Sequence, residues 1–182
     1  LIHAVIKGSA VNQDGRSQGI TAPNERAQVA VIKQALANAR IKPEEVSYVE
    51  AHGTGTPLGD PIEIQALDRA YSERRNANTH LKVGSLKTNF GHMEAAAGIA
   101  GLQKVILSLQ NETIPAHLNL TKPSSLIDWE NLSVQVPTQT QPWRSQHKEA
   151  NLHAGVSSFG FTGTNAHVVV SQAPERALPS DD

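Results

Sequence analysis

The chain has 182 residues with a hydrophobic fraction of 38%, enough for one domain with a core, although aromatic residues make up only 4%. The net charge of −1 argues against a basic nucleic-acid surface, because phosphate binding requires clustered Lys and Arg, so we expect no nucleic-acid partner. The chain has no cysteine, which excludes a disulfide framework, a thiol nucleophile and thiolate metal ligands within it.

No apolar run approaches the roughly 18 residues that a membrane helix needs, and no signal peptide is visible. We therefore expect a cytoplasmic protein that has no membrane partner. The first six residues already form a strand-like pattern, and the chain lacks an initiator methionine. These two features predict that the chain is part of a longer polypeptide.

The first part of the chain predicts alternating strands and helices. Residues 2–11 predict a strand that ends in a polar, turn-prone cluster. A helix is predicted after the capping residues 21–24, with an apolar stripe formed by Val29, Ile32, Ala35, Leu36 and Ala39. A second strand is predicted at residues 46–51. A second helix then runs to about residue 71, with Asp60 as its N-cap and Pro61 at its first position.

The second part predicts one more strand–helix step and then mostly strands. Residues 81–86 predict a strand, and residues 94–110 predict a helix rich in small residues. After an irregular stretch, further strands are predicted at residues 134–136, 152–158 and 165–171. Residues 173–182 predict a linker.

Two of these strands are each followed by a histidine beside a glycine and then by a helix. His52 follows the strand at residues 46–51, and His92 follows the strand at residues 81–86. The two histidines are 40 residues apart, which leaves room for one strand–helix–strand step. Ligands bind at the carboxyl ends of parallel strands in open α/β sheets. We therefore expect both imidazoles to face one crevice and to work in one site.

A third glycine-rich loop lies between the last two predicted strands. It spans residues 155–165 and contains glycines that let backbone N–H groups approach a ligand closely. Backbone amides of this kind are the usual donors of an oxyanion hole. Three such loops at one sheet edge are more typical of a reaction site than of a structural scaffold.

Each of these patterns also has a structural interpretation. A single histidine at a glycine turn is usually structural, and His167, which lies in a strand of valines, predicts a hydrogen-bonded core residue. No zinc-ligand spacing includes His52 or His92, so we expect no metal. The loop at residues 53–60 lacks the Gly-Lys-Ser/Thr of a phosphate cradle, and the chain has no Gly-x-Ser-x-Gly elbow. The remaining histidines are expected to be structural or exposed: His3, His80, His117, His147 and His153.

The long motifs resemble β-ketoacyl synthases of the modular polyketide synthase type. Residues 50–63, EAHGTGTPLGDPIE, resemble the first histidine motif of that family, and residues 87–92, KTNFGH, with residues 94–98 resemble the second. Residues 8–15 and 158–167 match the same family. The resemblance covers about residues 3–173, but only the carboxyl-terminal part of the family's domain. The upstream part, which carries the nucleophilic cysteine, is not in this chain.

The resemblance implies the carboxyl-terminal half of a thiolase-like α/β fold, in which two similar halves build five alternating layers (αβαβα). Residues 1–20 would end the first half, residues 21–172 would form the second half, and residues 173–182 would be a linker that follows the domain. It also implies a decarboxylative condensation of an acyl thioester with malonyl or methylmalonyl on an acyl carrier protein. The chain would then bind no cofactor, because the phosphopantetheine belongs to the carrier protein.

The same resemblance implies roles for seven residues. His52 and His92 would be neutral imidazoles whose N–H groups stabilise the oxyanion that decarboxylation creates, because burial and mutual repulsion disfavour their charged forms. Lys87 would organise hydrogen bonds near His92, with Glu63 as its carboxylate partner. The others would bind substrate: Thr54 and Thr56 the pantetheine arm, and Phe161 an oxyanion through its N–H and the acyl pocket through its ring.

Three interpretations remain open at this point. The first is half of a competent condensing enzyme, whose partners are the missing amino-terminal half, an acyl carrier protein and a second copy in a homodimer. The second is a non-elongating member that only docks carrier protein or a partner; the presence of both histidines favours the first. The third is a hydrolase or thiolase of similar fold, which predicts a cysteine that this chain lacks. For Glu63 and Lys87, a pair that only braces two loops is the alternative.

Overall fold

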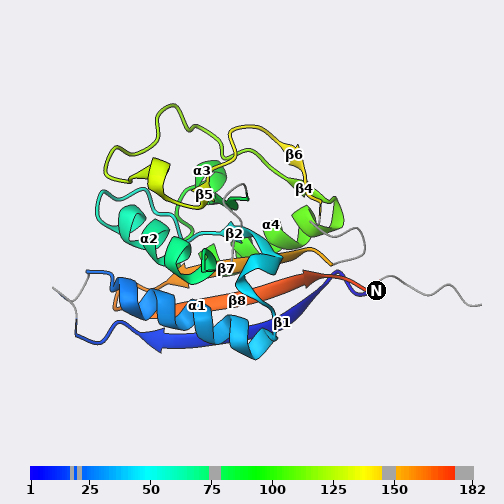
Figure 1. Ribbon diagram of the computed structural model, residues 1–182, viewed down its shortest axis with the longest axis horizontal. Coiled ribbons are helices and arrows are strands. Elements are labelled where there is room, and N and C mark those ends of the chain that lie inside the picture. The colour runs from blue at the N-terminus through cyan, green and yellow to red at the C-terminus, as the bar shows by residue number, and fades with distance from the viewer. Residues whose placement is uncertain (17–18, 20–21, 74–78, 145–150, 175–182) are drawn as a thin grey trace, which may run out of the picture.

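A six-stranded mixed sheet forms the centre of the molecule (Figure 1). The computed structural model describes residues 1–16, 19, 22–73, 79–144 and 151–174. Across the sheet the strands run in the order β1 (Ala4–Gln13), β8 (Thr164–Gln172), β7 (His153–Phe159), β2 (Val46–Glu50), β3 (Leu81–Gly84) and β5 (Val134–Gln135). β2 pairs in parallel with both β3 and β7, whereas β8 pairs antiparallel with β1 and β7.

Helices cover both faces of this sheet. The helices α1 (Glu25–Ala39) and α2 (Gly59–Tyr71) pack side by side on one face, and α4 (Ala97–Gln110) packs on the other (Figure 1). The described residues contain one further α-helical turn, α3 (Lys87–Phe90). The short elements are η1 (Pro43–Glu45), η2 (Glu94–Ala96), η3 (Trp129–Asn131) and a two-stranded pair, β4 (Thr113–Ile114) with β6 (Gln141–Pro142).

Alternation along the strands divides the core into two clusters. In β2, Val49 faces the cluster under α1 and α2, and its neighbour Tyr48 faces the cluster under α4. Successive residues of a strand point to opposite faces, so one buried strand serves both cores. In α1, four residues of the predicted apolar stripe are buried, whereas Val29 is only partly buried; the four are Ile32, Ala35, Leu36 and Ala39. Both faces of β2 are therefore covered, and its carboxyl end is held rigidly.

α1 begins where its sequence predicts, and hydrogen bonds close both of its ends. The Asn24 side chain caps the helix by accepting the backbone N–H groups of Arg26 and Ala27 at 3.1 and 3.4 Å. At the other end Arg40 is left-handed, with φ 56°, and its N–H closes the last turn on Ala37. α1 thereby lies across β1 and β8, beside the loop that follows β7.

The start of α2 differs from the prediction. The helix begins at Gly59, so its N-cap is Leu58 and not Asp60. The Asp60 N–H already bonds the Thr56 carbonyl at 3.2 Å, which extends the helical turn backwards, and its carboxylate instead accepts the Gly55 N–H at 3.0 Å. Asp60 therefore shapes the loop that precedes the helix.

Two further boundaries depart from expectation, and two predictions are not tested. The one-turn helix α3 was not predicted, because four residues are too few for a helical period to show. The predicted helix at residues 94–110 is a 3-10 turn at first, because Glu94 has φ 47°, and becomes α-helical from Ala97. The predicted division at residue 20 stays a prediction, although β1 is here the edge strand of the same sheet. Most of the predicted linker at residues 173–182 lies outside the described residues.

Candidate active site

His52 and His92 meet at the carboxyl ends of two adjacent parallel strands. β2 and β3 are paired through Glu50 and Gly84, so the loops that leave them start side by side. His52 lies two residues beyond β2, and His92 lies just after α3. Their ring centroids are 5.5 Å apart and their planes cross at 82°. The strand order thus brings together the two imidazoles that the sequence predicts for one crevice.

His52 is held as a neutral imidazole. Burial, followed by the positive charges of Lys87 and His92, lowers its pKa to about 4. Its ring lies 5.5 Å from that of Phe159 at the end of β7. The Nδ1 atom is buried and has no hydrogen-bond partner among the described residues. At neutral pH this ring can therefore donate a single N–H without carrying a charge.

The geometry of His92 fixes its tautomer. Its Nδ1 accepts the backbone N–H of Glu94 at 2.9 Å. A ring nitrogen that accepts carries no proton, so with this hydrogen bond the ring proton lies on Nε2. His92 is exposed, at a turn where Gly91 has φ 75° and permits the reversal after α3. The free Nε2–H is thus the group that this residue offers to a ligand.

Glu63 supports the His52 loop through the backbone. It lies on α2, is buried, and its two carboxylate oxygens accept the N–H groups of His52 and Gly53, each at 2.8 Å. Burial raises the pKa of Glu63 to about 7, while these two hydrogen bonds oppose the shift. Gly53 has φ 47°, and a Cβ there would lie 2.9 Å from Ser85 Cβ, so the loop turns where only glycine fits.

Lys87 and Glu63, the predicted partners, interact through their charges and not through a direct ion pair. No hydrogen bond or ion pair joins these two side chains within the described part of the chain, and both Glu63 oxygens already accept amides. Burial lowers the pKa of Lys87, and the charges of Glu63 and Glu50 oppose this shift from a distance. The motif does not show that two loop amides bind the Glu63 carboxylate, so a direct pair with Lys87 could not be judged from the sequence.

The two histidines open onto one cavity of about 440 Å³. Its lining comes from four separate parts of the chain and contains six of the seven predicted site residues: His52, Thr54, Thr56, Glu63, His92 and Phe161. Lys87 does not line it. The Thr56 hydroxyl accepts the N–H of Gly59, the first residue of α2, at 3.0 Å. Tertiary folding thus gathers the predicted residues around one space.

The loop between β7 and β8 forms another wall of this cavity. Gly160 and Gly163 use their N–H groups within the turn, on Thr164 and Gly160 respectively. Phe161 lies at the tip with its side chain 81% exposed, and no hydrogen bond within the described residues uses its N–H. Two imidazole N–H groups and one free backbone amide therefore border the same space. Such donors can stabilise an oxyanion that develops during a reaction.

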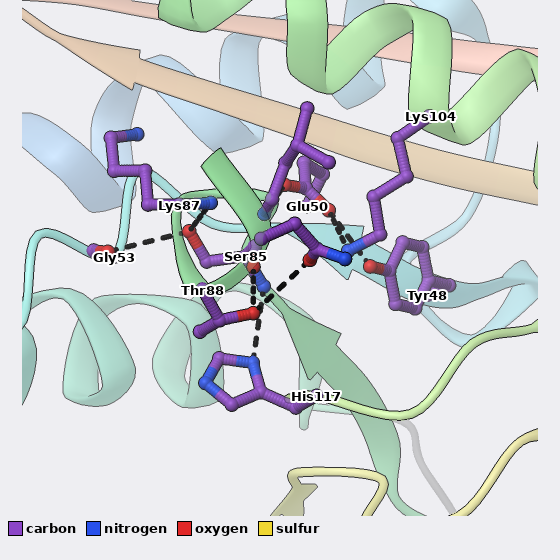
Figure 2. A network of polar contacts seen from close by, with 10 residues as sticks. Tyr48, Glu50, Gly53, Ser85, Lys87, Thr88, Lys104 and His117 are labelled. Atoms are coloured by element: carbon purple, nitrogen blue, oxygen red, sulfur yellow. Dashed lines mark hydrogen bonds and ion pairs between the residues drawn. The ribbon is translucent and has the colours of Figure 1, made fainter. Parts of the chain in front are cut away.

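Residues that carried no predicted role also contribute. Glu50 is 3% exposed and ion-paired with Lys104, and Ser85 donates to the Gly53 carbonyl at 3.3 Å (Figure 2). Gln28 lines the cavity, and its buried Oε1 has no partner among the described residues. Sequence signals existed for two of these residues: Glu50 is a charge within a buried strand, and Gln28 continues the apolar stripe of α1. Buried polar groups in such positions need partners.

The described residues give no sign of a metal centre or a membrane span. No group of three or more His, Cys, Asp or Glu side chains within them could hold a metal ion. None of the helices that the structure describes combines the length and hydrophobicity needed to cross a bilayer. His167, by contrast, is fully buried between Tyr71 and Ser157, with hydrogen bonds of 2.8 and 2.9 Å, which confirms its place in the core.

A mixed sheet with helices on both faces, and two histidines at the ends of adjacent strands, is the arrangement of one half of a thiolase-like ketosynthase fold. Residues 3–121 match the family model described as "Beta-ketoacyl synthase, C-terminal domain", and residues 123–182 match the "Ketoacyl-synthetase C-terminal extension". The chain belongs to the β-ketoacyl synthase family and is the C-terminal domain of a ketosynthase of the modular type I polyketide synthases.

Sequence relatives and solved structures agree with this assignment. The chain is 52% identical over 174 residues to polyketide synthase GfsA of Streptomyces halstedii and 50% identical over 176 residues to erythronolide synthase EryA3 of Saccharopolyspora erythraea. These alignments cover 96% and 97% of the chain but 2% and 6% of those proteins.

Among solved structures, the chain resembles a ketosynthase from module 6 of the bacillaene synthase of Bacillus subtilis 168, with TM-score 0.89 and 41% identity. It also resembles the oxazolomycin ketosynthase domain OzmH KS7 of Streptomyces albus JA3453, with TM-score 0.91 and 34% identity. These comparisons cover 96% and 98% of this chain, and 31% and 32% of those chains. The chain thus spans about a third of a solved ketosynthase.

Proposed function

We propose that the chain supplies the donor half of a condensing site. In that site an acyl thioester and malonyl- or methylmalonyl-acyl carrier protein undergo decarboxylative Claisen condensation during polyketide biosynthesis. The observation that carries the proposal is the pair of imidazoles, with centroids 5.5 Å apart, on one cavity to which this chain brings no cysteine. A cysteine in the amino-terminal half would hold the acyl chain.

The chemistry follows from where negative charge develops. When the extender loses its carboxylate as CO2, the electron pair of the broken C–C bond passes to an enolate whose charge lies on the thioester oxygen. The His52 and His92 N–H groups would donate hydrogen bonds to that oxygen. The enolate carbon then attacks the acyl thioester carbonyl, and the resulting tetrahedral oxyanion collapses to expel the cysteine thiolate. The Phe161 N–H would stabilise that second oxyanion, paired with the cysteine's own amide.

The other site residues would orient the reacting groups. Glu63 would hold the His52 loop by its two amides, and Lys87 would keep a positive charge near His52 and so favour its neutral form. Thr54 and Thr56 would bind the pantetheine arm, because both line the cavity. The chain itself would bind no cofactor and no metal, since the phosphopantetheine arrives on the acyl carrier protein.

The outer face of α4 supports a packing partner. Leu107 on that helix and Phe90 on α3 are 58% and 72% exposed, and they border a groove along α4. Apolar side chains exposed together usually mark an interface. We assign this face to the amino-terminal half of the domain, which would complete the layered fold. An acyl carrier protein and a second copy, in a homodimer, complete the expected partners.

The proposal is tested in a complete domain, formed by this chain and the amino-terminal half. His52→Ala or His92→Ala should slow decarboxylation by roughly 10²- to 10³-fold, about 3–4 kcal/mol, because one oxyanion donor is lost. Acyl loading on the cysteine should remain, since it does not need these donors. Gln65→Ala on the exposed side of α2 is the control and should change neither step.

Two results would contradict the proposal. Elongation at the wild-type rate by either histidine variant would remove the donor role. A wild-type complete domain that binds carrier protein but neither decarboxylates the extender nor elongates would support the alternative, a non-elongating docking module.

A further inference from the structure

A buried carboxylate joins the strands that carry the two histidine loops. Glu50 is the last residue of β2 and lies two residues before His52. Its Oε1 accepts the backbone N–H of Leu86, and its Oε2 accepts the Tyr48 hydroxyl at 2.8 Å and the Lys104 ammonium at 2.7 Å (Figure 2). Three donors therefore satisfy a side chain that is 3% exposed.

These contacts reach each element that holds a candidate catalytic residue. Leu86 immediately precedes α3, which begins with Lys87 and leads to His92. Lys104 is on α4, the helix that follows His92, and its side chain is only 13% exposed. Gly101 of the same helix lies against Glu50, because a Cβ there would be 3.0 Å from Glu50 Cγ. Glu50 is thus the meeting point of β2, the turn after β3, and α4.

A second tie runs in the opposite direction. Ser85, at the end of β3, donates its hydroxyl to the Gly53 carbonyl at 3.3 Å and accepts the Lys87 N–H at 3.4 Å (Figure 2). The Ser85 N–H bonds His117 Nδ1 at 3.3 Å, which anchors the turn from the other side. Glu50 at the end of β2 therefore holds the loop that leads to His92, and Ser85 after β3 holds the loop that contains His52.

The chemistry of the Glu50–Lys104 pair favours a geometric role over a stabilising one. Taking two charges out of water is costly, and a buried ion pair often adds no net stability compared with apolar side chains of similar volume. Such a pair fixes the relative positions of the segments that it joins, since its hydrogen bonds allow only one arrangement of the groups around it. Here the arrangement it selects is the spacing of the two loops.

We propose that Glu50 is a positioning residue of the active site, with Lys104 as its counter-ion. It sets the distance between His52 and His92 by tying the end of β2 to the Leu86 amide and to α4. Neither Glu50 nor Lys104 lines the cavity that contains the histidines. The inference rests on the function proposed above, because spacing matters only if both imidazoles bind one oxygen atom.

The first test separates decarboxylation from acyl loading in the complete domain. Glu50→Gln and Lys104→Met should each lower kcat for extender decarboxylation by about 10- to 100-fold, since displacement of a catalytic group by about 1 Å costs up to roughly 10²-fold. KM for the extender and the rate of acyl loading should change less than about threefold. Lys104→Arg, which keeps the charge, should recover most of the lost rate.

The matched control is the exposed ion pair of Lys33 and Glu73, whose side chains are 45% and 60% exposed. Lys33→Met and Glu73→Gln remove the same kinds of charge and should leave both partial reactions unchanged. The double variant Glu50→Gln/Lys104→Met removes both buried charges together, so it remains informative if a single variant fails to fold. It should decarboxylate as slowly as the single variants while it loads normally.

The second test does not depend on catalysis. Hydrogen–deuterium exchange of the peptide spanning residues 84–93 should become at least about tenfold faster at one amide in Glu50→Gln, because the Leu86 N–H loses its ionic acceptor. Unchanged exchange, unchanged decarboxylation, or equal loss of both partial reactions in the double variant would overturn the proposal. If the wild-type domain loads acyl groups but never condenses, the proposed function fails instead, and exchange alone decides whether Glu50 holds Leu86.

Discussion

At the scale of single residues, burial and backbone contacts decide the chemistry of the two histidines. His52 stays neutral because the protein around it is a poor solvent for charge and Lys87 adds a positive potential. His92 is exposed, and its acceptor bond from the Glu94 N–H sets the position of its proton. Two residues of one type thus become N–H donors by different physical routes.

The protonation of His52 gives a first prediction. Its folded pKa of about 4 lies below the value of 6.5 for a free histidine, so the unfolded chain binds a proton between these values and the native state does not. Stability is therefore lost as the pH falls below 6.5, and the native ring stays neutral down to about pH 4. An NMR titration of the ring proton, assigned with His52→Asn, should show this midpoint. A midpoint near 6.5 would contradict it.

Glu63 gives a second prediction, on stability. Glu63→Gln replaces one acceptor oxygen with an N–H donor that faces a loop amide, so either His52 or Gly53 loses its acceptor. We expect a loss of about 1–3 kcal/mol in urea denaturation of the complete domain, and no loss in Gln65→Ala on the exposed face of the same helix. A double-mutant cycle with Lys87→Met should give little coupling. A coupling energy above about 1 kcal/mol would instead show a direct pair.

At the scale of elements, close approach between β7 and its neighbours positions the wall of the site. A Cβ at Gly155 would lie 2.7 Å from His167 Nε2 and 2.8 Å from the Tyr71 hydroxyl, both of which are buried. The Tyr71–His167–Ser157 chain of hydrogen bonds therefore joins α2, β8 and β7 only because residue 155 has no side chain. Burial lowers the pKa of His167 to about 3, so this link stays uncharged.

This packing gives a third prediction. Gly155→Ala should destabilise the complete domain by about 1–3 kcal/mol, because the methyl group must displace a hydrogen-bonded pair in a closed core. Gly160→Ala is the control, since its nearest atom is 3.4 Å from the added carbon. Denaturant midpoints at equal slope measure the difference. Equal midpoints for the two variants would show that the core rearranges freely around residue 155.

At the scale of the whole molecule, the chain has an incomplete site and an exposed apolar surface, and a partner would complete the one and cover the other. The cavity has N–H donors but no cysteine nucleophile, because the chain has no cysteine. α4 buries Val105 and Leu109 on the sheet, yet Ile99 and Leu107 on its other side are 57% and 58% exposed. A surface helix normally places polar residues there. The two observations agree with an amino-terminal half that covers α4 and brings the cysteine.

The isolated chain gives a fourth prediction. Mass spectrometry after incubation with an acyl thioester analogue should show no stable covalent adduct. Addition of the upstream half as a separate polypeptide should form a soluble complex and restore some activity. Leu107→Ser should weaken that complex, because the apolar face of α4 is then interrupted, whereas Leu126→Ser, equally exposed but distant in sequence, should not. A stable acyl adduct on the isolated 182 residues would contradict the half-site interpretation.

Much of the fold was predictable because its signals are local. Short windows of sequence show the alternation of strand and helix and the cap at Asn24. They also show the repeated unit of strand, histidine and helix that contains His52 and His92. The convergence of the two histidines was predictable too, because parallel strands joined by a helix end at the same sheet edge. The four-residue helix α3 and the early start of α2 were not predictable. Both depend on hydrogen bonds within loops rather than on a periodic pattern of apolar residues.

The sequence by itself determined the class of fold, the order of its elements and the identity of the two imidazoles. Only the tertiary structure decided how those imidazoles are held. Glu63 binds two loop amides in preference to Lys87, and Glu50 pairs with a lysine 54 residues away. The physical reason is that a buried charge takes whichever donors the packed chain brings within reach. That choice depends on distances between segments remote in sequence, and no local pattern records them.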